Sequence, residues 1–204
     1  ASGLTLVFGV MGLINLAHGS FYMVGAYATA AVTASTGSFL IGLAAGMTAA
    51  ALVGALVELL VIRRLYHRPH LDQVLATFAL ILIFSEGTRW LFGSSPLWLS
   101  PPSWLTGFVT LPGDTRYPIY RLMLIGVGVA IAIGLYLLIS RTRLGMRIRA
   151  GESDREMIGA LGVNIAKLYT VVFALGAALA GLAGALVGAL QSVQVGMGEP
   201  VLIL

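Results

Sequence analysis

The sequence predicts an all-α, polytopic helical membrane protein with about six transmembrane segments. Of its 204 residues, 58% are hydrophobic and only 10% are charged, whereas about a quarter of the residues in a soluble domain carry charge. No Asp, Glu, Lys or Arg precedes Glu58. The 26 glycines lie mostly inside apolar runs, as in membrane helices that pack closely. This composition excludes an ordinary soluble globule. Because cysteine is absent, disulfides, thiolate metal sites and thiol nucleophiles are excluded as well.

The first 34 residues carry no acidic or basic side chain other than His18. A straight helix of that length would extend for about 51 Å, although the hydrocarbon core of a bilayer is only about 30 Å thick. We therefore expect a broken helix, and the polar, glycine-containing residues 15–20 are the place for the break. The chain starts without Met inside one apolar run and stops inside another. We accordingly expect residues 1–204 to be a single transmembrane domain, truncated at both ends.

Four later segments are apolar enough and long enough to cross a membrane, which takes about 20 residues. They are residues 40–62, 73–92, 117–140 and 168–190. Nine of the twelve Lys and Arg residues lie in the loops 63–72 and 141–167. The positive-inside rule makes these two loops cytoplasmic and makes residues 93–116 a periplasmic loop. The formal net charge of +4 is therefore a topology signal, and no nucleic-acid partner is expected.

Small residues recur at every fourth position in three of the spans, which predicts tight helix contacts. The stripes are Gly42/Gly46/Ala50/Gly54, Gly126/Ala130/Gly134 and the two stripes Ala180/Gly184/Gly188 and Ala177/Gly181/Ala185/Ala189. Glu58 continues the first stripe, and because a carboxylate is costly in lipid it should face the helix bundle. Glu86 and Arg89 are three residues apart and should form an ion pair near the outer interface.

The predicted coupling loop, residues 141–167, is too polar to span the membrane. Ser153 and Glu156 match a capping box, with Asp154 also in the first turn of the predicted helix. Met157 and Leu161 lie one turn apart, and Gly162 is suited to the left-handed stop. Asn164 can then cap the next span. A short helix over residues 153–161 is predicted to contact a cytoplasmic partner; the alternative is a helix that rests on lipid.

Asn15, His18 and Tyr22 are the candidate residues of a substrate pathway. They form a polar group inside an otherwise apolar stretch, where bare backbone is tolerated only next to protein or a water-filled cavity. Asn15 and neutral His18 can both donate and accept hydrogen bonds. Tyr22 lies one turn beyond His18. The three side chains could touch a passing zwitterion or could merely satisfy the unwound backbone, and the sequence leaves both alternatives open.

Three motifs resemble the permeases of branched-chain amino acid ABC transporters of the LivH type. They are GVMGLINLAHGSFYMVGAY at 9–27, RTRLGMRIRA at 141–150 with LGVN at 161–164, and AALAGLAGAL at 177–186. The resemblance implies a bacterial inner-membrane subunit of an importer for branched-chain or other hydrophobic amino acids. It further implies a second permease subunit, homologous or identical, two cytoplasmic ATPase subunits and a periplasmic substrate-binding protein. Ser153, Asp154, Glu156, Met157, Leu161 and Gly162 would form the contact with the ATPase.

Two other function classes remain. A secondary transporter of small polar solutes would also use broken helices and polar groups at mid-membrane. A polytopic membrane enzyme is less consistent with the sequence, because no Ser/His/Asp set, metal motif or other catalytic group can be assembled from it. The sequence also lacks a Gly-x-x-x-x-Gly-Lys-Ser/Thr loop. We therefore expect no catalytic residue, metal or cofactor in this chain, with ATP bound by partner subunits.

Overall fold

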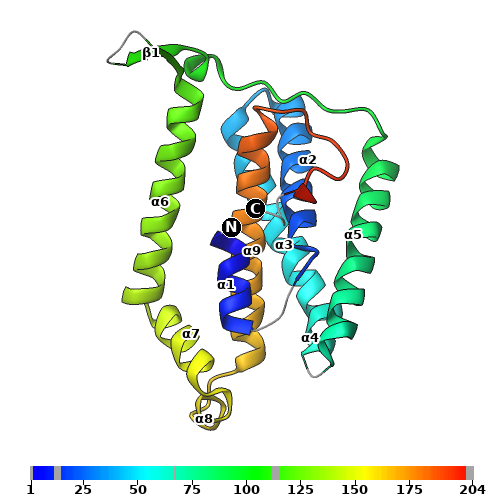
Figure 1. Cartoon of the computed structure of the whole chain (residues 1–204), viewed down its shortest axis with the longest axis vertical. Coiled ribbons are helices and arrows are strands. Elements are labelled where there is room, and N and C mark those ends of the chain that lie inside the picture. The colour runs from blue at the N-terminus through cyan, green and yellow to red at the C-terminus, as the bar shows by residue number, and fades with distance from the viewer. Residues whose placement is uncertain (1, 12–14, 67, 112–114, 201–204) are drawn as a thin grey trace.

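The computed structural model describes residues 2–11, 15–66, 68–111 and 115–200. Its centre is a bundle of three helices, α2 (His18–Thr36), α3 (Phe39–Val57) and α9 (Ile165–Gly188), which pack on one another. The short α1 (Ser2–Met11) lies against α9. On opposite sides of this bundle stand α5 (His70–Phe92) and α6 (Ile119–Arg141), as Figure 1 shows. The predicted polytopic helical class is confirmed.

Glycines bring the three central helices into backbone contact. A Cβ atom on Gly25 of α2 would overlap the backbone of Gly181 of α9, and a Cβ on Gly54 of α3 would overlap the Cβ of Ala177. Gly46 of α3 lies equally close to Gly25. Such contacts gain dispersion energy that any larger side chain would forfeit. The predicted small-residue contacts of α3 and α9 are thus confirmed.

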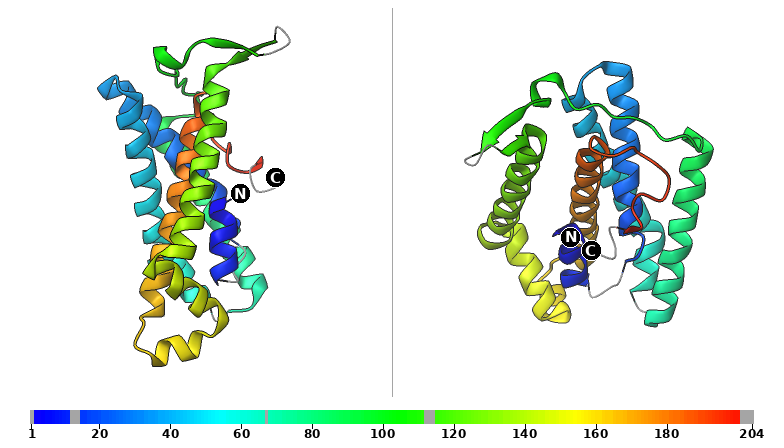
Figure 2. Two further views of the ribbon diagram at one scale, coloured as in Figure 1. Left: turned by 90° about the vertical axis from the view of Figure 1, so that its left-hand side faces the viewer. Right: turned by 45° about the horizontal axis from the view of Figure 1, so that its top comes forward.

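The small-residue stripe of α6 was predicted to make the same kind of contact, and this prediction is wrong for the described residues. A Cβ atom added to Gly126 or Gly134 would have no neighbouring atom within 4 Å, and Tyr120 is the only buried residue of α6. Its hydroxyl donates a 2.6 Å hydrogen bond to the Leu186 carbonyl. Below that point α6 stands apart from the central helices in Figure 1 and in the right-hand view of Figure 2. Periodicity reveals a small face but not the helix that covers it.

Four helices are long and apolar enough to cross a membrane within the described ranges. They are Phe39–Leu65, His70–Phe92, Ile119–Arg141 and Ile165–Gly188. The predicted number of about six is therefore not confirmed. The predicted break is confirmed, because residues 15–17 are non-helical and α2 begins at His18. His18 and Ser20, which were expected within the break, already belong to the first turn of the helix.

The two basic loops lie at one end of the molecule, here called the basic end. It holds the π-helical turn η1 (Glu58–Ile62), α4 (Arg63–Leu65), α7 (Arg143–Ser153) and α8 (Arg155–Ala160). The opposite end, here called the hairpin end, carries the 3-10 turn η2 (Ser103–Leu105) and an antiparallel hairpin of β1 (Phe108–Leu111) and β2 (Thr115–Pro118). Phe108 pairs with Pro118 and Leu111 with Thr115.

Two features remain, the outer ion pair and the C-terminal segment, here residues 189–200. Arg89 Nη1 lies 2.7 Å from Glu86 Oε1 on the exposed face of α5, as predicted. After α9 the chain is anchored at the hairpin end by a two-way backbone bridge between Val193 and Leu97. From there it runs back along α2 to about half the height of the bundle (Figure 1). Two distant parts of the sequence, the start of α2 and the C-terminal segment, thereby become neighbours.

Candidate functional site

Asn15 supports the non-helical backbone of residues 15–17, directly before α2. It is 1% exposed. Its Oδ1 accepts a hydrogen bond from the Ala17 amide at 3.1 Å, and its carbonyl accepts one from the His18 amide at 3.2 Å. Its Nδ2 has no partner within the described residues. Of the two roles that the sequence allowed, Asn15 therefore performs the structural one, and its Nδ2 group remains without a partner among the described residues.

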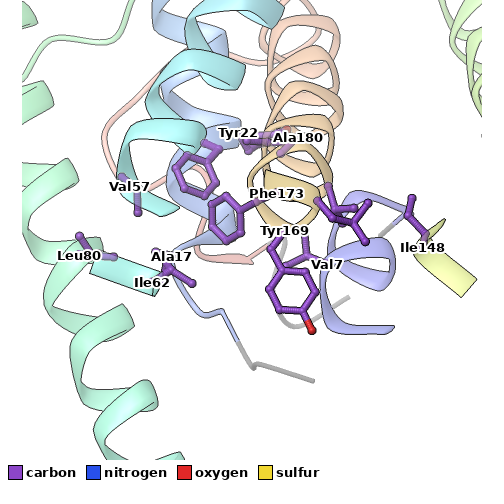
Figure 3. Packing of buried hydrophobic residues seen from close by; sticks show 14 residues of the cluster. Val7, Ala17, Tyr22, Val57, Ile62, Leu80, Ile148, Tyr169, Phe173 and Ala180 are labelled. Carbon is purple, nitrogen blue, oxygen red and sulfur yellow. The ribbon is translucent and has the colours of Figure 1, made fainter. Parts of the chain in front are cut away.

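His18 and Tyr22 are packed into the protein. Each is 6% exposed. The ring of His18 stands edge-on to Phe21, and a Cβ on Gly3 of α1 would lie 3.2 Å from its Nε2. Tyr22 lies in the apolar cluster with Phe173 and Ala180, visible in Figure 3. Neither residue, nor Asn15, is among the lining residues of the cavity beside the start of α2, of the groove between α7 and α9, or of the pocket between the end of α2 and residues 98–102. Their role in a pathway stays a prediction.

The next residues along α2 do line a small cavity, with a volume of about 10 Å³. Its walls come from the start of α2, from α5 and from the C-terminal segment. They are Leu16, Gly19, Ser20, Met23, Ile81, Ser85, Gly196, Gly198 and Glu199. Ser85 and Glu199 were missed by sequence reasoning. The sequence signal for Glu199 is weak: it is the only acidic residue after Glu156, but it lies beyond the last candidate span and is exposed.

A second polar cluster surrounds Glu58 at the basic end. Glu58 is 0% exposed, which confirms that it faces the bundle. Its Oε1 accepts a 2.9 Å hydrogen bond from the Tyr66 hydroxyl. Its Oε2 accepts a 2.7 Å hydrogen bond from the Thr170 hydroxyl and lies 3.3 Å from Arg63 Nη2. Burial, and after it the Glu58 carboxylate, raise the pKa of Tyr66. Tyr66 thus stays protonated and remains a donor.

This cluster ties η1 to the first turns of α9. Glu58 and Arg63 are five residues apart, the spacing that π-helical hydrogen bonds join, so the turn places both side chains on one face. Arg63 Nη2 also donates to the Thr170 hydroxyl at 2.8 Å and to the Ala166 carbonyl at 3.5 Å. A buried carboxylate needs this many partners to offset the loss of its hydration. The sequence indicated that Glu58 faces inward but not which residues receive it.

The predicted coupling helix forms one residue later than expected. Asp154 Oδ1 accepts a 2.9 Å hydrogen bond from the Met157 amide, and α8 covers Arg155–Ala160. The proposed Ser153 cap is wrong, because α7 continues through Ser153 and the Asp154 amide bonds to the Ala150 carbonyl at 3.0 Å. Asp154 is the first residue in extended conformation and so takes the cap. The side chain of Glu156 lies outside the described residues.

The two other predictions for this loop, a glycine that ends the short helix and an asparagine that caps the next one, are confirmed. Gly162 has a φ of 84°, in the left-handed region that glycine adopts without strain. Asn164 Oδ1 accepts a 3.0 Å hydrogen bond from the Lys167 amide and caps α9. The chain thus passes from α8 into α9 in four residues.

One face of α8 presents apolar side chains to the outside. Met157 is 60% exposed and Leu161 is 76% exposed. Ile158, between them, is 5% exposed and faces inward. Beside this surface lies a groove of about 230 Å³ between α7 and the start of α9, with Arg147 and Lys167 among its lining residues. The combination of apolar side chains and neighbouring cations is typical of a protein contact surface.

Comparison with known proteins supplies the family. Residues 1–203 match the family described as the branched-chain amino acid transport system permease component. The permease protein BraD of a high-affinity branched-chain amino acid transport system in Pseudomonas aeruginosa is 30% identical over 200 residues, covering 92% of this chain. The corresponding LivH protein of Escherichia coli K12 is 28% identical over 204 residues, with the same coverage.

A relative named for another substrate also matches. The putative glucose ABC transporter permease TsgC13 of Haloferax volcanii is 28% identical over 187 residues, which covers 85% of this chain and 54% of that protein. The chain spans 65% of the length of BraD and LivH. No solved structure matches it. Because the match to the family extends over nearly the entire chain, the chain belongs to the family described as the branched-chain amino acid transport system permease component.

Proposed function

We propose that this chain is the membrane-spanning subunit of an ATP-driven importer for branched-chain or other hydrophobic amino acids, located in the bacterial inner membrane. The proposal is supported by the family and by the names of BraD and LivH. In it, the basic end is cytoplasmic and the hairpin end, with residues 93–116, is periplasmic. A second permease subunit, two ATPase subunits and a periplasmic binding protein complete the assembly, and ATP is bound by the partner subunits.

The observation that carries the coupling part of the proposal is the exposed face of α8. Met157 and Leu161 point away from the protein, whereas Ile158 anchors the helix to it. A helix that rests on anionic lipid is usually basic along its polar face, but here Asp154 stands at its N-terminus. We infer that Met157 and Leu161 enter an apolar pocket of an ATPase subunit. Movement of that subunit would reach α9 through residues 161–164.

The test replaces Met157 or Leu161 by Asp in the complete importer. Each variant forces a charge into the dry contact, and such burial costs several kcal/mol. We expect the ATPase subunits to be lost in co-purification, or leucine uptake to lose its dependence on ATP. Met157→Leu is the matched control, because it keeps the apolar contact and should retain both properties. Unchanged co-purification and unchanged uptake in both Asp variants would show that α8 rests on lipid.

The substrate class is tested separately by uptake into proteoliposomes that hold the complete importer and its binding protein. We expect ATP-dependent uptake of leucine and no uptake of glucose. ATP-dependent uptake of glucose alone would assign the chain to the substrate in the name of TsgC13. Uptake of either solute driven by an ion gradient without ATP would instead identify a secondary transporter.

A further inference from the structure

The cavity beside the start of α2 lies half-way between the basic end and the hairpin end. The C-terminal segment closes it, because Gly198 packs directly against Gly19, and a Cβ atom on either glycine would overlap the backbone of the other. Gly196 in the same turn has a φ of 84°. Within about 10 Å³ there is room for about one water molecule. A larger ligand therefore requires the turn at 196–199 to move outward.

Two hydroxyl groups face this cavity without a protein partner. Ser20 is only 5% exposed, and neither its Oγ nor that of Ser85 makes a hydrogen bond within the described residues. Hydroxyls in helices commonly bond to the carbonyl four residues earlier, as Thr48 and Thr77 do here. Because a buried hydroxyl without a partner costs free energy, Ser20 indicates that water or a ligand completes it, and the half-buried Ser85 lines the same cavity.

Other unpartnered hydroxyls in the bundle have a different setting. Thr29 and Thr33 also lack hydrogen-bond partners among the described residues, but their Oγ1 atoms pack against Gly46 and Gly42 of α3. These two hydroxyls fill space between helices. Ser20 and Ser85 differ because they line one cavity together with the carboxylate-bearing Glu199.

The cavity has an acidic side chain on one side and the positive end of a helix on the other. Glu199 is an exposed residue at the rim of the cavity, and its carboxylate pairs with no basic side chain in the described part of the chain. On the other side lies the first turn of α2, where Ala17 provides no side-chain cap. The amides of His18 and Ser20 bond to the carbonyls of Asn15 and Ala17, so the Gly19 amide is the donor that this positive helix end offers to an anion. Leu16, Met23 and Ile81 supply apolar surface between them. A small molecule with an ammonium group, a carboxylate and an apolar side chain matches all three.

We propose that Ser20, Ser85 and Glu199 form a binding subsite for the zwitterionic head of a hydrophobic amino acid on its way through the membrane. Glu199 receives the ammonium group, the first turn of α2 receives the carboxylate, and the two serine hydroxyls bridge them. The turn at 196–199 is the lid of this subsite and carries its anionic residue. The inference rests on the proposed function for its substrate class.

The test uses cysteine, which the native chain lacks. Ser85→Cys and, in a separate variant, Ser20→Cys are nearly isosteric and are placed in the complete importer in proteoliposomes. Each is treated with a cationic aminoethyl methanethiosulfonate or an anionic sulfonatoethyl methanethiosulfonate, and the rates are normalised to Ser94→Cys in the exposed outer loop. Glu199 should favour the cationic reagent by about tenfold. Added Glu199→Gln should abolish this preference, whereas Glu199→Asp and the exposed control Glu86→Gln should retain it.

Protection by ligands then decides which group of the substrate is recognised. Leucine and isopentylamine, which carry the ammonium group, should slow the modification, whereas isocaproate, which lacks it, should not. Absence of the charge preference in both cysteine variants, or its persistence in Glu199→Gln, would overturn the subsite. Charge preference without protection by leucine or the amine would show that Glu199 only complements the positive end of α2, and would overturn it equally.

The two proposals can fail separately. Leucine uptake with no charge preference at either cysteine would leave the importer function standing and remove the subsite. Charge preference and protection by isopentylamine, combined with uptake of a different amine-bearing solute in place of leucine, would support the subsite and refute the substrate class of the importer.

Discussion

At the basic end of the bundle the buried carboxylate of Glu58 accepts hydrogen bonds from Arg63, Tyr66 and Thr170, whereas half-way along the bundle the hydroxyls of Ser20 and Ser85 face a cavity without a partner among the described residues. Both clusters place polar groups inside an apolar protein, where an unsatisfied group is costly. The first is complete in itself and joins helices, but the second is incomplete without a further molecule. The role of a polar residue inside this bundle thus depends on which hydrogen-bond partners surround it rather than on the type of its side chain.

The largest effect is expected from removing the cation of the Glu58 cluster. Arg63→Met leaves the fully buried Glu58 carboxylate without its counter-charge, which should lower the free energy of unfolding in detergent by about 3 kcal/mol. Arg64→Met, at the exposed neighbouring residue, is the control and should change it by less than about 0.5 kcal/mol. Restored stability in the double variant Glu58→Gln/Arg63→Met would show that the lost free energy comes from the unpaired charge. Equal stability of Arg63→Met and the native chain would contradict the structural role of the cluster.

A smaller effect is expected from the hydroxyl that connects α9 to η1. Thr170→Val keeps the shape of the side chain but removes the 2.7 Å hydrogen bond to Glu58, at a cost of about 2 kcal/mol for a bond to a charged group. Thr48→Val serves as the control, because the Thr48 hydroxyl bonds only to carbonyls of its own helix. Chemical denaturation of the two variants measures the difference. A loss as large in Thr48→Val as in Thr170→Val would argue against a specific tie between α9 and η1.

The smallest change in stability is expected for the two serines that line the cavity beside α2. Ser20→Ala and Ser85→Ala remove hydroxyls that have no partner among the described residues, so the free energy of unfolding should change by no more than about 0.5 kcal/mol in either direction. The half-saturating leucine concentration for uptake should rise in the same variants, because the subsite loses contacts with the substrate. A stability loss equal to that of Thr170→Val, with uptake unchanged, would make the two clusters alike and would remove the contrast between them.

Several features could be predicted from the sequence because they depend on neighbouring residues alone. Charge content and the long apolar runs indicate helices that must leave water. The polar residues near Asn15 predict the break before α2, and Gly162 and Asn164 predict where the chain turns between α8 and α9. The close approach of α3 and α9 follows from small residues at every fourth position. Each of these signals is contained within one or two helical turns.

Only the tertiary structure decided the rest, because the deciding contacts join distant parts of the chain. The sequence pattern of α6 is as suited to close packing as that of α3, yet no described helix covers it. Ser153 is a good cap in isolation, but the extension of α7 leaves that task to Asp154. Ser85 and Glu199 acquire a common cavity with Ser20 only when the C-terminal segment folds back from the hairpin end to the start of α2. A local sequence pattern records what a residue can do, whereas its neighbours in space determine which hydrogen bonds it makes and which it leaves open to a ligand.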